Sequence, residues 1–285
     1  MWILFALLNP VTEGFRSLFI KKSSAEVESV VIAWVNNLLP TLVFAPCLFF
    51  IELKFNTDFW IGLIGGASIY AVTNILYMKA LSHGDISIVM PMLSFTPLFL
   101  LVTSPLIVGE FPHLTGIIGV VLIVIGSYML NLSESKKHLL EPFRALLKNK
   151  GTRYMLIVAL LWSVSSNFDK LAVKNSSVFQ YLGFTSPFIF IFTSFITIPT
   201  KQFKFSEIKK GKDNLIKVTL LTTLANIFHM TAISLTYVAY VIAIKRTTAI
   251  ISVFIGSKFL NETNITERLL GVIVMLIGVI LIVLS

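Results

Sequence analysis

NILYMKALS at residues 74–82 is matched by NIFHMTAIS at residues 226–234, and the match then continues without a gap. Residues 74–130 align with residues 226–282, with 12 identities in 57 positions. Upstream, FALLNPVTEGFRSLFIKKSS (5–24) aligns with VALLWSVSSNFDKLAVKNSS (158–177), with 9 identities in 20 positions. The sequence therefore predicts two copies of one unit of about 150 residues.

The composition places both copies in a membrane. Hydrophobic residues make up 56% of the chain and charged residues 13%, and the mean hydropathy is +0.88. A soluble domain carries about 25% charged residues. The net charge of +9 is interpreted as basic cytoplasmic loops and not as nucleic-acid binding. Cys47 is the sole cysteine, so no internal disulfide and no metal cluster around it are expected. No cofactor is expected either.

Ten apolar segments reach the length of about 20 residues that a spanning helix needs. The predicted fold is an all-α polytopic membrane protein with two five-helix repeats, residues 1–132 and 154–285, joined by a basic loop at 133–153. Because five is odd, the second repeat would be inverted relative to the first, an arrangement typical of alternating access. The predicted spans are 2–20, 29–51, 59–81, 86–108, 113–132, 154–173, 178–200, 215–235, 237–257 and 267–284.

The distribution of basic residues predicts the orientation. One side of the membrane would carry 16 Lys and Arg residues, whereas the other would carry Lys54 and Lys174, with Lys170 near the same end. Positive residues remain cytoplasmic. We therefore expect a multi-pass protein of the plasma or inner membrane with both termini outside. The basic connections 133–153 and 201–214 are either surface helices or solvated linkers.

Several stretches resemble a known family. ALLWSVSSNFDKLAVK (159–174), SPLIVGE (104–110), FIGSKFLNE (254–262) and the closing GVVLIVIG and GVIVMLIG are similar to the EamA-type transporters of the drug/metabolite transporter superfamily. The resemblance covers essentially the whole chain. It implies ten helices in two inverted halves and a central cavity lined mainly by the first four helices of each half. It also implies export or uptake of small metabolites, often amino acids, driven by ion gradients or exchange. Better-known relatives are usually drawn with both termini inside, and the charge count departs from them here.

Four ionisable residues are predicted to lie near the middle of the membrane. Glu13 and Arg16 belong to the first span, and Lys245 and Arg246 belong to the ninth. Such residues cost about 2.5–3.5 kcal/mol at mid-bilayer and are functional candidates. Their charges sum to +2, so Lys245 or Arg246 would hold an anionic group of a substrate, and Glu13 would carry a proton or an amino group. Alternatively, Glu13 and Arg16 form a self-contained structural pair on one helix face.

Polar residues at repeat-related positions form a second set of substrate-binding candidates. Asn74 corresponds to Asn226, and Tyr77 corresponds to His229. They either line a cavity or join neighbouring helices by hydrogen bonds. His229 could titrate between pH 5 and 8. Asn36 is a further cavity candidate.

Charged residues near the ends of spans are candidate gates. Lys79 and Asp85 flank the tight connection between the third and fourth spans. Asp169 and Lys170 lie near the outer end of the sixth span, where they either gate a pathway or extend their charges toward water.

Prolines and glycines predict how the spans pack. Pro10, Pro91 and Pro97 break helical hydrogen bonds, so the first and fourth spans are expected to be kinked and central. Glu110 and Glu262 recur at span ends, which favours a structural role. Glycines seven residues apart predict close contact of the fifth and tenth spans: Gly119, Gly126, Gly271 and Gly278.

Together these features predict a secondary active transporter that moves a small polar metabolite, such as an amino acid or an organic acid, by alternating access. The alternatives are a flippase for a lipid-linked substrate, an accessory subunit and an intramembrane enzyme. No HExxH or GxSxG motif and no paired mid-span aspartates support an enzyme, and no catalytic or metal-binding residue is assigned. The expected partners are the substrate, membrane lipid and a coupling proton or ion. A monomer holds both halves, so a monomer or a homodimer is expected.

Overall fold

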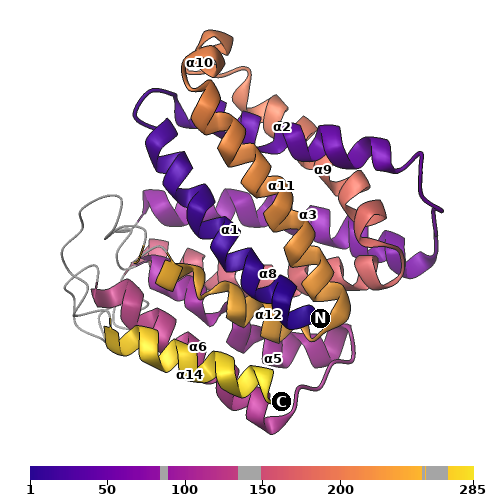
Figure 1. Cartoon of the computed structure of the whole chain (residues 1–285), viewed down its shortest axis with the longest axis vertical. Coiled ribbons are helices and arrows are strands. Elements are labelled where there is room, and N and C mark those ends of the chain that lie inside the picture. Colours follow the sequence, from indigo (N-terminus) through magenta and orange to yellow (C-terminus); the bar gives the residue numbers. More distant parts are fainter. Residues whose placement is uncertain (84–88, 134–148, 252–253, 255–268) are drawn as a thin grey trace.

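The computed structural model describes residues 1–83, 89–133, 149–251, 254 and 269–285, and all regular structure in these ranges is helical (Figure 1). The first half contains α1 (Trp2–Ser23), α2 (Ser29–Cys47), α3 (Thr57–Ser82), the 3-10 helix η1 (Met90–Phe95), α5 (Thr96–Ile107) and α6 (Leu114–Ser133). The second half contains α8 (Lys150–Lys174), α9 (Val178–Thr197), the short α10 (Phe205–Lys210), α11 (Lys212–Leu235), α12 (Val238–Lys245) and α14 (Leu269–Val283).

The membrane assignment is supported by six segments that are long and apolar enough to span a bilayer. These are α1, α2, η1 with α5, α8, α9 and α11, and α6 and α14 are shorter apolar helices. The described part of the chain is therefore that of an all-helical membrane protein. The prediction of ten spans extends beyond this set, because α3 and α12 do not belong to it.

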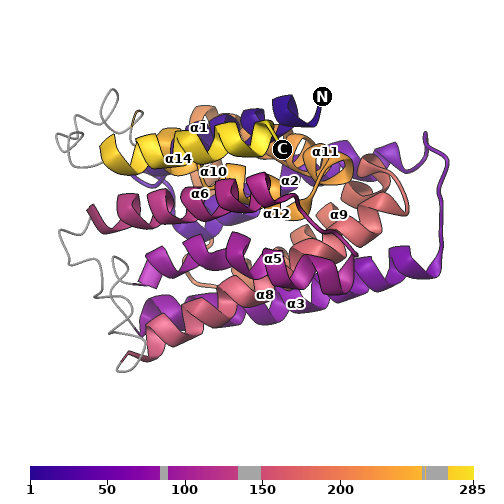
Figure 2. The same ribbon diagram turned by 90° about the horizontal axis from the view of Figure 1, so that it is seen from below.

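Each half packs its first and third helices against those of the other half, which we call exchanged packing. In the sequence alignment, α1 corresponds to α8, and α3 corresponds to α11. In the structure α1 packs along α11, and α3 packs along α8. Thus the first helix of each half lies on the third helix of the other half. The second helices, α2 and α9, pack on each other, as do α6 and α14, which run in opposite directions (Figure 2). This arrangement is that of an inverted repeat.

Glycines bring α6 and α14 into backbone contact. A Cβ atom added to Gly119 would lie 2.6 Å from the carbonyl oxygen of Gly278, and one added to Gly126 would lie 2.6 Å from that of Gly271. The reciprocal distances are 2.6 Å from Gly278 and 2.9 Å from Gly271. Such close approach adds dispersion contacts between helices that gain no hydrophobic energy from leaving lipid. The predicted glycine contact is confirmed.

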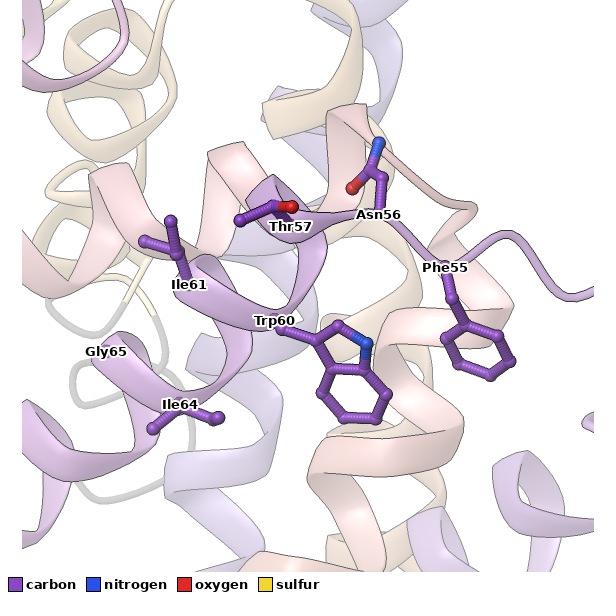
Figure 3. A pocket seen from close by; sticks show the side chains of 7 residues that line it. All are labelled: Phe55, Asn56, Thr57, Trp60, Ile61, Ile64 and Gly65. Atoms are coloured by element: carbon purple, nitrogen blue, oxygen red, sulfur yellow. The ribbon is translucent and has the colours of Figure 1, made fainter.

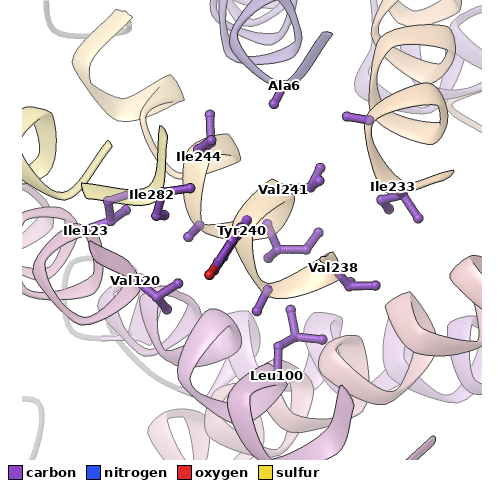
Figure 4. Packing of buried hydrophobic residues seen from close by; sticks show 14 of the residues in the cluster. Ala6, Leu100, Val120, Ile123, Ile233, Val238, Tyr240, Val241, Ile244 and Ile282 are labelled. Atoms are coloured by element: carbon purple, nitrogen blue, oxygen red, sulfur yellow. The ribbon is translucent and has the colours of Figure 1, made fainter. Parts of the chain in front are cut away.

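The first seven of the eight residues of helix α12, Val238 to Ile244, are buried. Its side chains pack against α1, α5, α6, α11 and α14, and Figure 4 shows this cluster. At 1.5 Å per residue α12 is about 12 Å long, so its last residue, Lys245, lies well inside the bundle. The members of the cluster that Figure 4 labels are Ala6, Leu100, Val120, Ile123, Ile233, Val238, Tyr240, Val241, Ile244 and Ile282.

One ion pair joins the end of α11 to the start of α12. Lys170 of α8 donates to the carbonyl oxygens of Ile233 (2.6 Å) and Thr236 (2.7 Å), and its Nζ lies 2.9 Å from Oε1 of Glu110. Oε2 of Glu110 accepts a hydrogen bond from the backbone N–H of Val238 at 2.9 Å. Backbone groups that helix ends leave open are thereby satisfied. The helix-end role predicted for Glu110 agrees with this geometry, and Glu262 lies outside the described residues.

The fourth and ninth spans differ from the continuous helices that the sequence predicts. Residues 90–107 divide into η1 and α5, and α12 ends at Lys245 before a turn at 246–247. Pro97 lacks the N–H that would bond the carbonyl oxygen of Leu93, and the hydroxyl of Thr96 donates to this oxygen instead at 2.9 Å. In contrast, α1 continues as one helix through Pro10.

Substituting Gly126 by valine tests the contact between α6 and α14. The added carbons would meet the backbone of Gly271, which cannot move without moving α14, so we expect a destabilisation of about 1–3 kcal/mol. The measurement is the thermal unfolding midpoint of the purified protein in detergent. Ile125→Val is the matched control, because Ile125 is 46% exposed on the same helix. An unchanged midpoint for Gly126→Val would refute the contact.

Substituting Glu110 by glutamine tests the link between α11 and α12. Lys170 is 6% exposed and would lose its anion, so we expect a loss of about 3–5 kcal/mol, seen as a lower unfolding midpoint. The double variant Glu110→Gln with Lys170→Met should recover part of this loss, because no buried charge remains. Glu52→Gln, at an exposed carboxylate, should melt like the natural protein.

Candidate functional site

Charged side chains from α1 and α12 meet inside the bundle. Arg16 forms an ion pair with Glu13, and Nζ of Lys245 lies 3.7 Å from Oε1 of Glu13. Glu13 is 13% exposed and Lys245 is 36% exposed. Glu13 therefore lies between two cations. Because Glu13 itself is little exposed, water and salt screen these attractions only weakly. The structure thus brings together three of the four charges that the sequence places at one depth.

Arg246, the fourth member, differs from the other three. It is partly buried, its Nε has no hydrogen-bond partner among the described residues, and no carboxylate there lies within 4.0 Å of it. The four charges still sum to +2. An unpaired guanidinium in a dry environment favours a carboxylate or a phosphate, which it can bind with two parallel hydrogen bonds.

The interruption of the ninth span positions this cluster. After Lys245 the backbone turns: the N–H of Arg246 donates to Ala243 at 2.9 Å, and the N–H of Thr247 donates to Ile244 at 2.9 Å. The hydroxyl of Thr248 donates to the carbonyl oxygen of Lys245 at 2.7 Å. Cations are favoured near the C-terminus of a helix by its dipole. Interrupted helices near the middle of the membrane are where inverted-repeat transporters build their sites.

The interruption recurs in the first half, but the charges do not. Thr96, where α5 begins, aligns with Thr248, where helix resumes in the ninth span. Lys245 and Arg246 align with Leu93 and Ser94, which are 7% and 2% exposed. The two halves therefore share one backbone design, and the second half alone carries this positive charge.

A cavity of about 180 Å³ lies among α3, α8, α9 and α11, and we call it the polar cavity after the polar groups in its mainly apolar wall. Its charged group is Asp169 of α8, whose Oδ1 accepts a hydrogen bond from the hydroxyl of Tyr181 at 2.6 Å. Asn226, predicted from the repeat, also lines it. The complete lining is Gly66, Ala67, Tyr70, Ser165, Asp169, Tyr181, Leu182, Thr185, Ser186, Phe188, Ile189, Asn226 and Met230.

A wider hollow of about 530 Å³ lies at the start of α3 and has a different character (Figure 3). Phe55 and Trp60 stack there with ring centroids 5.5 Å apart, and both rings are exposed, as is Ile64. Exposed aromatic rings at the end of a spanning helix are typical of the membrane–water interface. This hollow therefore belongs to the lipid-facing surface and not to the candidate site.

Other predicted site residues join helices. The side-chain oxygen of Asn36 accepts a hydrogen bond from the hydroxyl of Thr222, which ties α2 to α11. Tyr77 stacks on Trp162 with ring centroids 5.8 Å apart. His229 is partly buried, and its Nδ1 has no partner in the part of the chain that the structure describes.

Asp169 and Lys170, two of the four candidate gate residues, have different partners in the structure. Lys170 binds Glu110 and the end of α11, whereas Asp169 faces the polar cavity. The carbonyl oxygen of Lys79 lies 2.9 Å from Nδ1 of His83 near the end of α3. Asp85 and the side chain of Asn74 lie outside what the structure describes, so their predicted roles stay predictions.

The hydroxyl residues of the polar cavity were not predicted. Tyr181, Thr185 and Ser165 belong to apolar helices in which serine and threonine also bond their own backbone, as Thr185 does to the carbonyl oxygen of Tyr181 at 2.8 Å. One signal did exist: Asp169 aligns with Arg16 of the first half, so both copies carry a charge at this position, with opposite signs.

Comparisons with known proteins agree with this architecture. The sequence matches the EamA-like transporter family over residues 1–132 and 149–284. A search of curated proteins returned no significant match. A solved structure described as "Crystal structure of protein" is similar with a TM-score of 0.73 over 99% of this chain and 97% of that chain, at 14% identity, a likeness that shows the fold alone.

The family match covers nearly the whole chain in two segments, and these segments contain the repeat, the interrupted spans and the central charges. Members of this family are transporters and not enzymes. The chain therefore belongs to the EamA-like transporter family and is an integral membrane transporter of small molecules.

Proposed function

We propose that this protein is a secondary active transporter that moves a small polar metabolite with an anionic group, such as an amino acid or an organic acid. The observation that carries the proposal is the charge cluster where α12 ends. Glu13 is neutralised by Arg16 and Lys245, while Arg246 has no carboxylate within 4.0 Å among the described residues. A substrate anion supplies the missing partner.

Alternating access between the halves is supported by their exchanged packing. We propose ten membrane crossings in two inverted repeats, residues 1–132 and 154–285. Because α1 lies on α11 and α3 lies on α8, one rocking motion would open one of these contacts as it closes the other. The polar cavity lies at the α3–α8 contact. One chain holds both halves, so a monomer suffices for transport.

A binding screen identifies the substrate class. The full-length protein in detergent is heated with single compounds that carry a carboxylate, a phosphate or no anion: alanine, glutamate, citrate, uridine diphosphate glucose and glucose. We expect compounds with an anion to raise the unfolding midpoint, because a ligand that binds the native state stabilises it. A rise with glucose alone would contradict the anion site.

Substituting Arg246 by glutamine tests the role of this residue. Loss of a charge-assisted hydrogen bond costs about 1.5–3 kcal/mol, so we expect about 10- to 100-fold weaker binding of the compound found in the screen. Counterflow exchange of the same compound in proteoliposomes should fall in parallel. Lys54→Gln, at an exposed lysine, is the matched control. Natural rates for Arg246→Gln with normal membrane insertion would exclude Arg246 from the site.

We also propose that the basic loops lie in the cytoplasm and both termini lie outside. With Cys47 replaced by alanine, a single cysteine at Ser285 should react in intact cells with a maleimide that does not cross membranes. A single cysteine at Ser206 in α10 should react only after the cells are opened, because positive loops stay inside. The reverse pattern would invert the proposed orientation.

A further inference from the structure

Asp169 differs from the other interior carboxylates in its lack of a counter-charge. Three partly buried carboxylates belong to the spanning part of the described chain: Glu13, Glu110 and Asp169. Glu13 pairs with Arg16 and Lys245, and Glu110 pairs with Lys170. No Lys, Arg or His of the described residues lies within 4.0 Å of Asp169. An unpaired carboxylate in a membrane interior is costly, which points to a ligand.

The hydrogen bonds of Asp169 leave room for this ligand. Tyr181 donates its hydroxyl to Oδ1, and no second donor among the described residues bonds the carboxylate. Opposite the carboxylate stands Gly66, whose missing side chain keeps the space open: a Cβ there would lie 3.0 Å from Oδ1. The cavity therefore reaches the charged group directly.

The polar lining of the cavity consists mainly of oxygen atoms. Hydroxyl groups come from Tyr70, Ser165, Tyr181, Thr185 and Ser186, and an amide comes from Asn226. Hydroxyl and carboxylate oxygens coordinate hard cations and also accept hydrogen bonds from an ammonium group. The volume of about 180 Å³ suits a small cation with a few waters, each of which occupies about 30 Å³.

We propose that this cavity is a subsite for a small monovalent cation, either Na⁺ or a primary ammonium group, whose charge neutralises Asp169. The subsite stands on the cavity and its unpaired carboxylate. Its part in transport, as the site of a coupling ion or of the amino group of the substrate, rests on the proposed function. It replaces Glu13 as the cation site, because Glu13 already has two cationic partners.

The subsite and the anion site interact. Met230 lines the cavity and also packs against the buried cluster that contains Ile244, the residue before Lys245. A cation at Asp169 would remove a negative charge that opposes a substrate anion near Lys245 and Arg246. Binding at the two sites should therefore be positively coupled, with each ligand raising the affinity for the other about fivefold or more.

Cation titrations of the full-length protein test the subsite. The protein in detergent and choline chloride is titrated with NaCl or with methylammonium chloride, and binding is followed by calorimetry. We expect saturable binding of at least one cation and at least tenfold weaker binding to Asp169→Asn, which keeps the acceptor for Tyr181 and loses the charge. Glu52→Gln, at an exposed carboxylate, should bind like the natural protein.

The two probes separate the sources of the cation. Saturation by Na⁺ assigns the subsite to a free ion, whereas saturation by methylammonium alone assigns it to the amino group of a substrate. If Asp169→Asn does not fold, Gly66→Ala decides, because its methyl group enters the cavity beside the carboxylate and should weaken binding. Absence of saturation with both cations, or unchanged affinity in the folded variants, overturns the subsite.

The outcome is independent of the test on Arg246. If cation binding fails while Arg246→Gln still loses anion binding and exchange, the subsite is wrong and the proposed function stands. If cation binding depends on Asp169 while Arg246→Gln exchanges normally, the proposed anion site is wrong and the subsite stands.

Discussion

The ion pair between Lys170 and Glu110 determines where the central charges lie. It closes the end of α11 and starts α12 at Val238, so the eight residues of α12 end at Lys245 inside the bundle. In a bilayer core no water is present to satisfy the backbone groups that such a break exposes. The break is possible because charged and hydroxyl side chains of neighbouring segments take the place of water.

The lack of water in the bilayer core also explains why the two repeats share their backbone structure but differ in their charges. The helix pairs that join the halves need equivalent surfaces, and in the α6–α14 pair small residues such as Gly119 and Gly278 recur to supply them. Charges need a partner or a ligand, and under the proposed function a duplicated anion site would bind the same substrate anion twice along one pathway. The positions of the first half that align with Lys245 and Arg246 accordingly carry the uncharged Leu93 and Ser94.

The sequence predicted the features that depend on patterns along the chain. Repeats, apolar runs and glycine spacing predicted the membrane class, the inverted halves and the α6–α14 contact. The meeting of Glu13 with Lys245 could also be predicted, because helical rise converts residue number into depth. The end of α12 at Lys245 could not be predicted from local sequence, since residues 238–250 contain no proline or glycine that would mark it. The cavity at Asp169 was likewise hidden, because its walls come from four helices.

The alignment of Arg16 with Asp169 gives the two states of the proposed cycle different charges. In the present structure Arg16 pairs with Glu13, and a hollow lies beside Asp169. If the halves exchange conformations, the hollow beside Asp169 closes as the equivalent space beside Arg16 opens. A cation would then be bound in one state and displaced in the other, because its site is lost and a positive charge occupies the equivalent position. Such a difference in affinity between two states is what allows an ion to shift their equilibrium.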